Sequence, residues 1–151
     1  LDALYYDDEV KAELRSRLGL EEDKSISFVK YSDYKKNVSS YSKSKNEIAV
    51  IVADGEIVPG SSNQGIVGSA TIREAIRKAR TNDRVKAIVV RVNSPGGVFQ
   101  SADEMWRELR LATEAKPVIA SMGTYAASGG YYLAMACDTI VAQPTTITGS
   151  I

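Results

Sequence analysis

Short apolar runs alternate with segments of helical character from residue 47 onward, and this alternation limits the possible folds more than any other feature of the chain. The runs are rich in valine, isoleucine and alanine, which is typical of strands buried on both faces. The predicted strands are 47–55, 85–92, 117–123 and 138–144, with a short return strand at 56–58. The predicted helices are 70–80, 101–115 and 128–136. Strands that alternate with helices predict an α/β fold with a parallel sheet and right-handed crossovers.

Two serines are predicted to begin helices. Ser69 directly precedes the helix 70–80 and belongs to a residue type favoured at the N-cap. Ser101 stands three residues before Glu104, which is the spacing of a capping box.

The first 46 residues have a different character. A helix is predicted at 7–19, with acidic residues in its first turn and Gly19 at its end, and a strand is predicted at 25–31. Residues 35–46 are rich in serine and lysine, which indicates a linker. We therefore expect a connector at 1–46 and a second domain at 47–151. The chain starts without methionine and stops in TTITGSI, so we expect a fragment of a longer protein, truncated at the C-terminus of that domain.

Two glycine-bearing turns follow predicted strands, namely VNSPGG at 92–97 and YAASGGYY at 125–132. The exits of neighbouring parallel strands lie at the same edge of a sheet, so the two turns are expected to face each other across one pocket. Pro95 restrains the first turn, while Gly96 and Gly97 allow a substrate backbone to approach and can direct an N–H group into the pocket. A tight turn with no further role is the alternative for this segment.

Ser128 is the candidate nucleophile of the second turn. Small residues, Ala126 and Ala127 before it and two glycines after it, leave room for a substrate chain over the hydroxyl. A helix that begins here would place the N–H of Gly129 beside a tetrahedral intermediate. The local sequence fits a serine N-cap equally well. Taken together, the two turns predict an acyl-transfer site.

Composition excludes several kinds of site. Histidine is absent, which removes Ser-His-Asp catalysis and most zinc sites from this chain and leaves lysine as the leading candidate for a base. Lys plus Arg and Asp plus Glu both number 19, and no basic stripe is present, so no nucleic-acid partner is expected. No phosphate-binding glycine motif occurs, and neither a cofactor nor a metal is expected. The single cysteine, Cys137, lies in an apolar run typical of a buried, inert thiol.

The segments VNSPGG, SMGTYAASGGYY and IVAQPTTITGSI, in this order, resemble the S49 serine peptidases, the family of the signal peptide peptidases. The resemblance covers residues 47–151 and implies a Clp protease/crotonase-like fold built from repeated β-β-α units. Residues 1–46 resemble the region that joins the two homologous halves of double-length members. On this basis the chain would span that junction and the first part of the second half.

The resemblance implies that Ser128 is the nucleophile of a Ser/Lys dyad. It further implies that Gly97 and Gly129 form the oxyanion hole, next to Gly96, and that Ser150 orients the lysine. We expect Gly96 and Ala127 to lie against the substrate. No lysine of this chain is assigned as the base, because those at 86 and 116 precede strands at the wrong edge and those at 24–45 lie in the connector. The fragment alone is therefore expected to be inactive.

The family also implies a substrate class and a location. The expected substrates are hydrophobic peptides, including remnants of cleaved signal peptides. The expected assembly is a homo-oligomer, a tetramer in the double-length form, at the bacterial cytoplasmic membrane with its catalytic part on the periplasmic side. No apolar run of this chain reaches the roughly 20 residues that cross a bilayer, so an anchor would lie outside it.

Two alternatives remain open from the sequence. A crotonase-type acyl-CoA enzyme would use the same glycine N–H groups to hold an enolate, but it would need a carboxylate at the pocket. A non-catalytic half would only bind peptide or build an oligomer.

Overall fold

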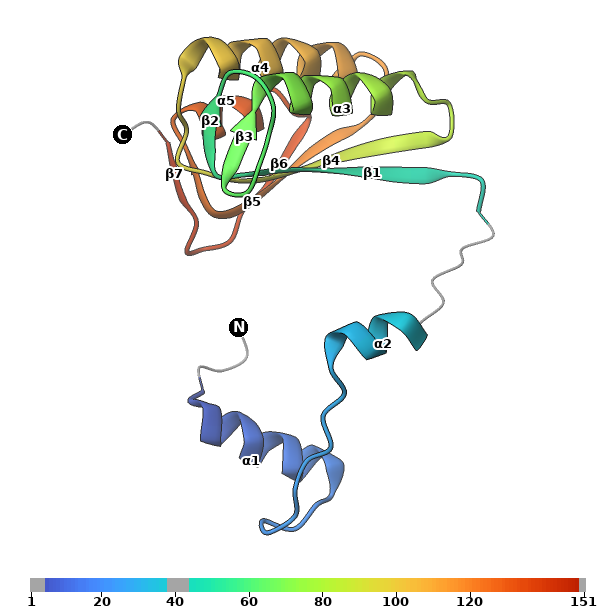
Figure 1. The fold of residues 1–151 in the computed structure, drawn as a ribbon, viewed down its shortest axis with the longest axis vertical. Coiled ribbons are helices and arrows are strands. Elements are labelled where there is room, and N and C mark those ends of the chain that lie inside the picture. The colour runs from blue at the N-terminus through green and yellow to red at the C-terminus, as the bar shows by residue number, and fades with distance from the viewer. Residues whose placement is uncertain (1–4, 38–43, 150–151) are drawn as a thin grey trace. The chain divides into compact units, whose positions relative to one another are not determined.

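The computed structural model describes residues 5–37 and 44–149 and divides the chain into two units, Leu1–Lys43 and Ser44–Ile151 (Figure 1). In the first unit, helix α1 (Asp7–Leu18) has Asp7, Asp8 and Glu9 in its first turn, where acidic side chains interact favourably with the helix dipole. It ends at Gly19, whose φ of 64° is left-handed and suits a glycine. The predicted helix at 7–19 is confirmed.

The predicted strand at 25–31 is wrong. Residues 25–30 have no regular structure, and helix α2 (Tyr31–Asn37) begins where the strand was expected to end. A strand needs a neighbour to accept its backbone hydrogen bonds, and the described residues of the first unit contain no other strand. Phe28 and Val29 are each 67% exposed, so the alternation of apolar residues does not mark a buried face here.

The second unit contains a sheet in which every strand pairing is parallel. Its strands are β1 (Glu47–Asp54), β4 (Val85–Ser94), β5 (Val118–Ala127), β6 (Thr139–Val141) and β7 (Ile147–Gly149). The order is β1-β4-β5-β6, and β7 pairs with the later part of β5. A smaller parallel pair is formed by β2 (Glu56–Val58) and β3 (Ile66–Gly68), and Ile57 of β2 also bridges Gly97.

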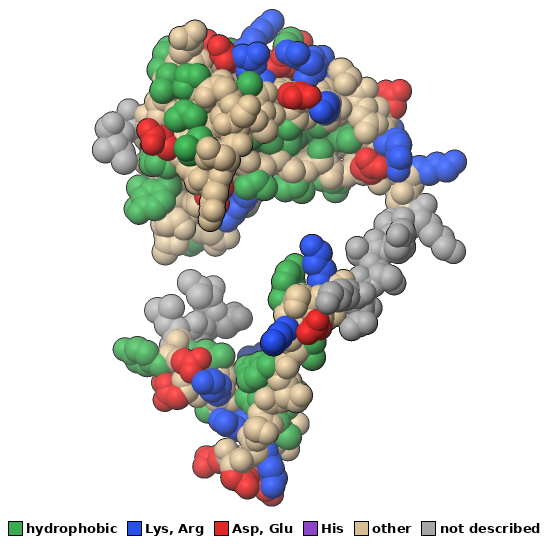
Figure 2. Space-filling view, viewed as in Figure 1, with side chains coloured by type: hydrophobic (Ala, Val, Ile, Leu, Met, Phe, Trp, Pro, Cys, Tyr) green, Lys and Arg blue, Asp and Glu red, His purple; other side chains and the backbone are tan. Residues whose placement is uncertain are grey.

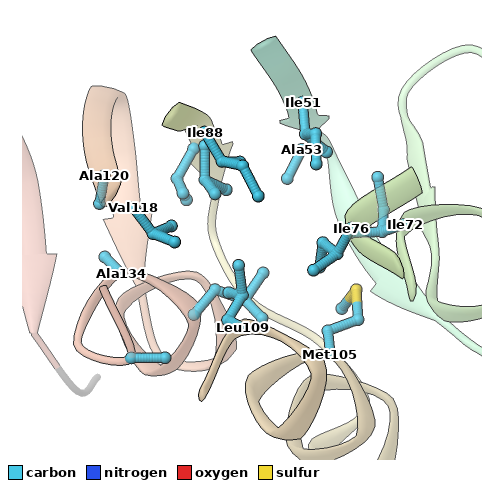
Figure 3. Packing of buried hydrophobic residues seen from close by; sticks show 14 of the residues in the cluster. Ile51, Ala53, Ile72, Ile76, Ile88, Met105, Leu109, Val118, Ala120 and Ala134 are labelled. Atoms are coloured by element: carbon cyan, nitrogen blue, oxygen red, sulfur yellow. The ribbon is translucent and has the colours of Figure 1, made fainter. Parts of the chain in front are cut away.

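Helices α3 (Ser69–Thr81), α4 (Phe99–Thr113) and α5 (Gly129–Ala134) lie on one side of the sheet (Figure 1). The core forms between them and the inward side chains of the strands. Figure 3 shows the contributing residues Ile51, Ala53, Ile88, Val118 and Ala120 from the strands and Ile72, Ile76, Met105, Leu109 and Ala134 from the helices. On the opposite face of β1, Ile48, Val50 and Val52 are exposed, and apolar side chains are visible along the lower edge of this unit in Figure 2.

Both predicted serine caps are wrong. Gly68 is the N-cap of α3, and the Ser69 hydroxyl instead donates to Glu104 Oε2 of α4 at 3.3 Å. Helix α4 begins at Phe99 after the N-cap Val98, so Ser101 lies inside the helix and is buried. The start of each helix is set by the extended segment before it, because β3 and the Gly97 segment both pair with β2.

Candidate active site

Ser128 lies between β5 and α5, exposed to solvent. Its φ of 49° and ψ of −122° make it the one non-glycine residue with a positive φ in the described part of the chain. Such a conformation costs about 1–3 kcal/mol and persists only where surrounding contacts enforce it. Two backbone bonds do so here, from Ser128 N–H to Gly149 O at 2.6 Å and from Tyr132 N–H to Ser128 O at 2.9 Å.

Ser128 directly precedes α5 and so occupies its N-cap position, but its side chain makes no capping hydrogen bond. A serine selected as a helix cap would direct its oxygen at the first N–H groups of the helix. The geometry favours a free hydroxyl on a strained strand-to-helix turn, which is the arrangement that exposes a nucleophile in many hydrolases.

The first turn leaves one N–H group unused. Gly96 N–H donates to Ser94 Oγ at 3.1 Å, and Val98 N–H donates to Ile57 O at 2.9 Å. Gly96 O in turn accepts Ile57 N–H at 2.8 Å. Between these bonded neighbours, the N–H of Gly97 has no acceptor among residues 5–37 and 44–149.

The structure brings the two turns together. A Cβ atom added to Gly96 would lie 2.7 Å from Ser128 Cβ and 2.8 Å from Gly129 N. A Cβ added to Gly97 would lie 2.1 Å from Ile57 O. Glycine is therefore required at both positions, by Ser128 on one side and by β2 on the other.

An open cavity of about 230 Å³ lies at this junction. Its walls are formed by Gly97, Phe99, Ser128, Gly129, Tyr131, Tyr132 and Gly149. Gly129 is the first residue of α5, so its N–H has no partner within the helix. Ser128, with its exposed side chain, thus lines one cavity with Gly97 and Gly129, whose N–H groups have no acceptor in the described part of the chain. A hydroxyl and two such donors can attack a carbonyl and hold the resulting oxyanion once a base takes the hydroxyl proton.

The two predicted substrate-binding residues do not line this cavity. Gly96 and Ala127 are buried, and neither is among the cavity-lining residues. Their assignment as substrate-binding positions stays a prediction. Ser150 lies outside the described residues, so its predicted role also stays a prediction.

Sequence reasoning missed the aromatic wall of the cavity. The rings of Phe99 and Tyr132 pack at a tilt with their centroids 5.7 Å apart, and Trp106 packs on Tyr132 with a centroid distance of 5.8 Å. Tyr132 Oη donates to Asp103 Oδ1 at 3.0 Å, and this hydrogen bond raises the pKa of Tyr132. The available signal was proximity in sequence, because Phe99 lies two residues after the first glycine turn and Tyr132 is the last residue of the second.

No ionisable side chain other than tyrosine lines this cavity within the described ranges. The Lys116 ammonium donates to the carbonyls of Ala79 and Asn82, away from the cavity. Burial, with a contribution from Asp138, raises the pKa of Cys137 to about 12, so its thiol stays protonated near neutral pH. The described residues hold no cluster of three metal-ligating side chains and no helix of sufficient length and apolarity to cross a membrane.

Comparison with known proteins supports an assignment by family. Residues 110–151 match the model of Peptidase family S49. The chain is 46% identical over 153 residues to "Serine protease SPPA, chloroplastic" of Arabidopsis thaliana and 40% identical over 153 residues to "Protease 4" of Salmonella typhi. These alignments cover 97% and 100% of the chain but 23% and 24% of the relatives, so the chain spans about a quarter of their length.

A solved structure shows the same fold. A variant of the 1510-N membrane-bound stomatin-specific protease, in complex with a substrate peptide, matches with a TM-score of 0.55 at 24% identity. The match covers 70% of this chain and 45% of that one. The predicted Clp protease/crotonase-like α/β fold with a parallel sheet is confirmed.

Proposed function

The chain belongs to peptidase family S49, and from this premise we propose that it carries the nucleophile and the oxyanion hole of a serine endopeptidase. The observation that supports the proposal most directly is the junction of the two turns. Ser128, with its exposed side chain, lines the same cavity as Gly97 and Gly129, whose N–H groups have no acceptor among the residues that the structure describes.

The proposed reaction proceeds through an acyl-enzyme. Ser128 Oγ attacks the carbonyl carbon of the scissile peptide bond while its proton passes to a base, and the carbonyl oxygen becomes an oxyanion. The N–H groups of Gly97 and Gly129 donate to that oxygen. The proton then passes to the leaving amine as the C–N bond breaks, and water hydrolyses the ester by the same steps in reverse order.

Gly97 is a better donor than Gly96. The Gly96 N–H is already bonded to Ser94 Oγ, and the Gly96 carbonyl is bonded to Ile57. Using Gly96 as the donor would require breaking the bond to a buried serine, whereas the Gly97 N–H is available without rearrangement.

The proposed base is a lysine of the whole protein that lies outside residues 1–151. The sequence holds no histidine, and no lysine lines the cavity in the described residues. We propose that Ser150 orients this lysine, completing a Ser/Lys dyad. Residues 1–151 alone are then expected to be inactive, because an unassisted serine hydroxyl is a weak nucleophile at neutral pH.

Hydrophobic peptides, such as remnants of cleaved signal peptides, are the proposed substrates. The aromatic side chains Phe99, Tyr131 and Tyr132 along the cavity support this choice, because they offer apolar surface to a peptide. The bacterial relatives named Protease 4 support a bacterial setting. We further propose that the whole protein acts at the bacterial cytoplasmic membrane as a membrane-anchored homo-oligomer, a tetramer, with its catalytic part periplasmic.

A fluorophosphonate probe, which acylation-competent serines attack, tests the proposal in the whole protein. We expect the native protein to be labelled and the Ser128→Ala variant to remain unlabelled. Ser121→Ala is the matched control, because Ser121 lies earlier on β5 with its hydroxyl bonded to Arg91, and it should be labelled normally. Labelling of residues 1–151 alone should be no faster than that of Ser128→Ala.

The same experiment addresses the other two functions. Binding of an acyl-CoA without labelling would indicate a crotonase-type enzyme, which the absence of a carboxylate along the cavity disfavours within the described residues. Neither labelling nor acyl-CoA binding would indicate a non-catalytic half.

A further inference from the structure

Strand β5 carries an irregularity just before Ser128. Val92 of β4 pairs with Met122 of β5, and the next paired residues are Ser94 and Ala126. One residue of β4, Asn93, thus stands opposite three residues of β5, those at 123–125. The two extra residues form a bulge that interrupts the regular ladder of backbone hydrogen bonds.

The side chain of Asn93 takes over the missing backbone contact. Asn93 Oδ1 accepts the N–H of Tyr125 at 3.2 Å, and Asn93 Nδ2 donates to Asp54 Oδ1 at 2.7 Å. These partners fix the orientation of the amide, because a backbone N–H can only donate and a carboxylate can only accept. The Asn93 carbonyl is turned the other way and accepts Gly55 N–H at 3.0 Å.

Gly123 makes room for this side chain. A Cβ atom at Gly123 would lie 2.7 Å from Asn93 Oδ1 and 2.9 Å from Asn93 Cβ. The Gly123 carbonyl is held from the other side by Thr146 Oγ1 at 2.9 Å. The bulge is therefore stabilised by specific contacts: the Asn93 side chain packs against Gly123, and hydrogen bonds hold Gly123 and Tyr125.

The bulge sets how far along the sheet Ser128 lies. If the pairing of Val92 with Met122 continued without interruption, Ser94 would stand opposite residue 124. Ser128 would then lie two residues further from the Pro95–Gly97 turn, about 6–7 Å at the rise of a strand. The bulge absorbs this length, so that Ala126 faces Ser94 and Ser128 faces Gly96.

From this arrangement we infer that Asn93 is a positioning residue for the reaction: its side chain holds the β5 bulge that aligns Ser128 with the oxyanion-hole turn. The inference rests on the proposed function of Ser128. Asn93 is not among the described residues that line the cavity, so it would act through Tyr125 and the strand that leads to the nucleophile.

The test measures the second-order rate of fluorophosphonate labelling in the whole protein, together with kcat and KM for a peptide substrate. Asn93→Ala should slow labelling and lower kcat by about 10²-fold, because a misplacement of about 1 Å has an effect of that size, while KM stays within about twofold. Asn93→Asp should also slow labelling, because the new carboxylate faces Asp54. The exchange Asn93→Asp with Asp54→Asn restores an amide–carboxylate pair that still accepts Tyr125 N–H, and it should recover the rate to within about threefold.

Asp138→Ala is the matched control for stability. Asp138 Oδ2 accepts the N–H of Val118 at 2.8 Å, so this variant removes an equivalent side-chain bond from the opposite end of β5. It should lower the melting temperature as Asn93→Ala does but leave the labelling rate unchanged.

Equal labelling of Asn93→Ala and the native protein would overturn the inference. The inference would also be overturned if Asn93→Ala and Asp138→Ala lost labelling rate equally. The same holds if the exchange variant folds but is labelled as slowly as Asn93→Asp. If Asn93→Ala does not fold, Asn93→Asp and the exchange decide the matter. Failure of the native protein to label would contradict the proposed function itself.

Discussion

Ser128 adopts a backbone conformation that its own side chain disfavours. The residues around it enforce this conformation through bonds to Gly149 and Tyr132, and the cavity side of the turn is left open. Strain at this exposed residue points to a role for its hydroxyl, because the Ser128 side chain makes no capping hydrogen bond to α5.

Two replacements of Ser128 separate the effect of backbone strain on stability from the role of the hydroxyl in labelling. Ser128→Gly and Ser128→Ala should both abolish fluorophosphonate labelling, because both lack the hydroxyl. Ser128→Gly should be the more stable by about 1 kcal/mol, since glycine accepts a φ of 49° while alanine keeps the strain. Urea denaturation of the two variants gives the difference, and an alanine variant as stable as the glycine variant would show that the turn relaxes.

Gly96 offers a second test at the scale of one residue. Gly96→Ala should slow labelling about 10²-fold or more, because the new methyl would lie 2.7 Å from Ser128 Cβ and would displace the nucleophile. Gly60→Ala is the control, with a similar positive φ of 85° but no atom within 4 Å of the added carbon. It should destabilise the fold by about 1–2 kcal/mol and leave the labelling rate unchanged.

At the scale of elements, the sequence predicted α1, the three helices of the second unit and its main strands, but not α2. The prediction failed where the structure of a segment depends on pairing with a segment distant in sequence. The strand at 25–31 lacked a neighbour, and the starts of α3 and α4 depend on pairing with β2 rather than on the serines at 69 and 101. Strand β5 was predicted to end at Gly123, whereas this glycine marks the bulge and the strand continues to Ala127.

Helices α3 and α4 are joined by a charged contact whose contribution can be measured. Glu108 of α4 is buried and pairs with Arg77 and Arg80 of α3. Glu108→Ala should lower the free energy of unfolding by about 2–3 kcal/mol, because Arg80 would lose its partner in a partly buried site. The control is Glu74→Ala, which removes an exposed pair with Lys78 within α3 and should change stability very little. Equal losses would show that α3 and α4 are held together by packing alone.

At the scale of the whole molecule, the sheet of the second unit has one covered face and one open face. Ile51 of β1 is 6% exposed under the helices, whereas its neighbour Val50 is 63% exposed on the other face. Ile51→Ala should therefore cost about 2–4 kcal/mol, and Val50→Ala less than about 1 kcal/mol. Urea denaturation at several protein concentrations checks both values. A large, concentration-dependent loss for Val50→Ala would show that this face is covered by self-association.

The location of the candidate site was predictable from the order of strands and helices, but its detailed contacts were not. Parallel strands bring their exits to one edge, so the meeting of the 92–97 and 125–132 turns followed from the order of elements. The choice between the Gly96 and Gly97 N–H groups did not follow, because it depends on bonds to Ser94 and Ile57. The aromatic wall was likewise hidden, since only packing shows that Phe99 and Tyr132 meet.

The bulge in β5 also bears on how the length of this chain can vary through evolution. Deleting one residue between Gly123 and Ala127 would draw Ser128 back by about 3.3 Å and turn each following side chain to the opposite face of the sheet. The loop between β2 and β3 faces no such limit, because an added residue there shifts nothing that the nucleophile depends on. Insertions and deletions among relatives of this chain should therefore accumulate in that loop and be absent between Gly123 and Ala127.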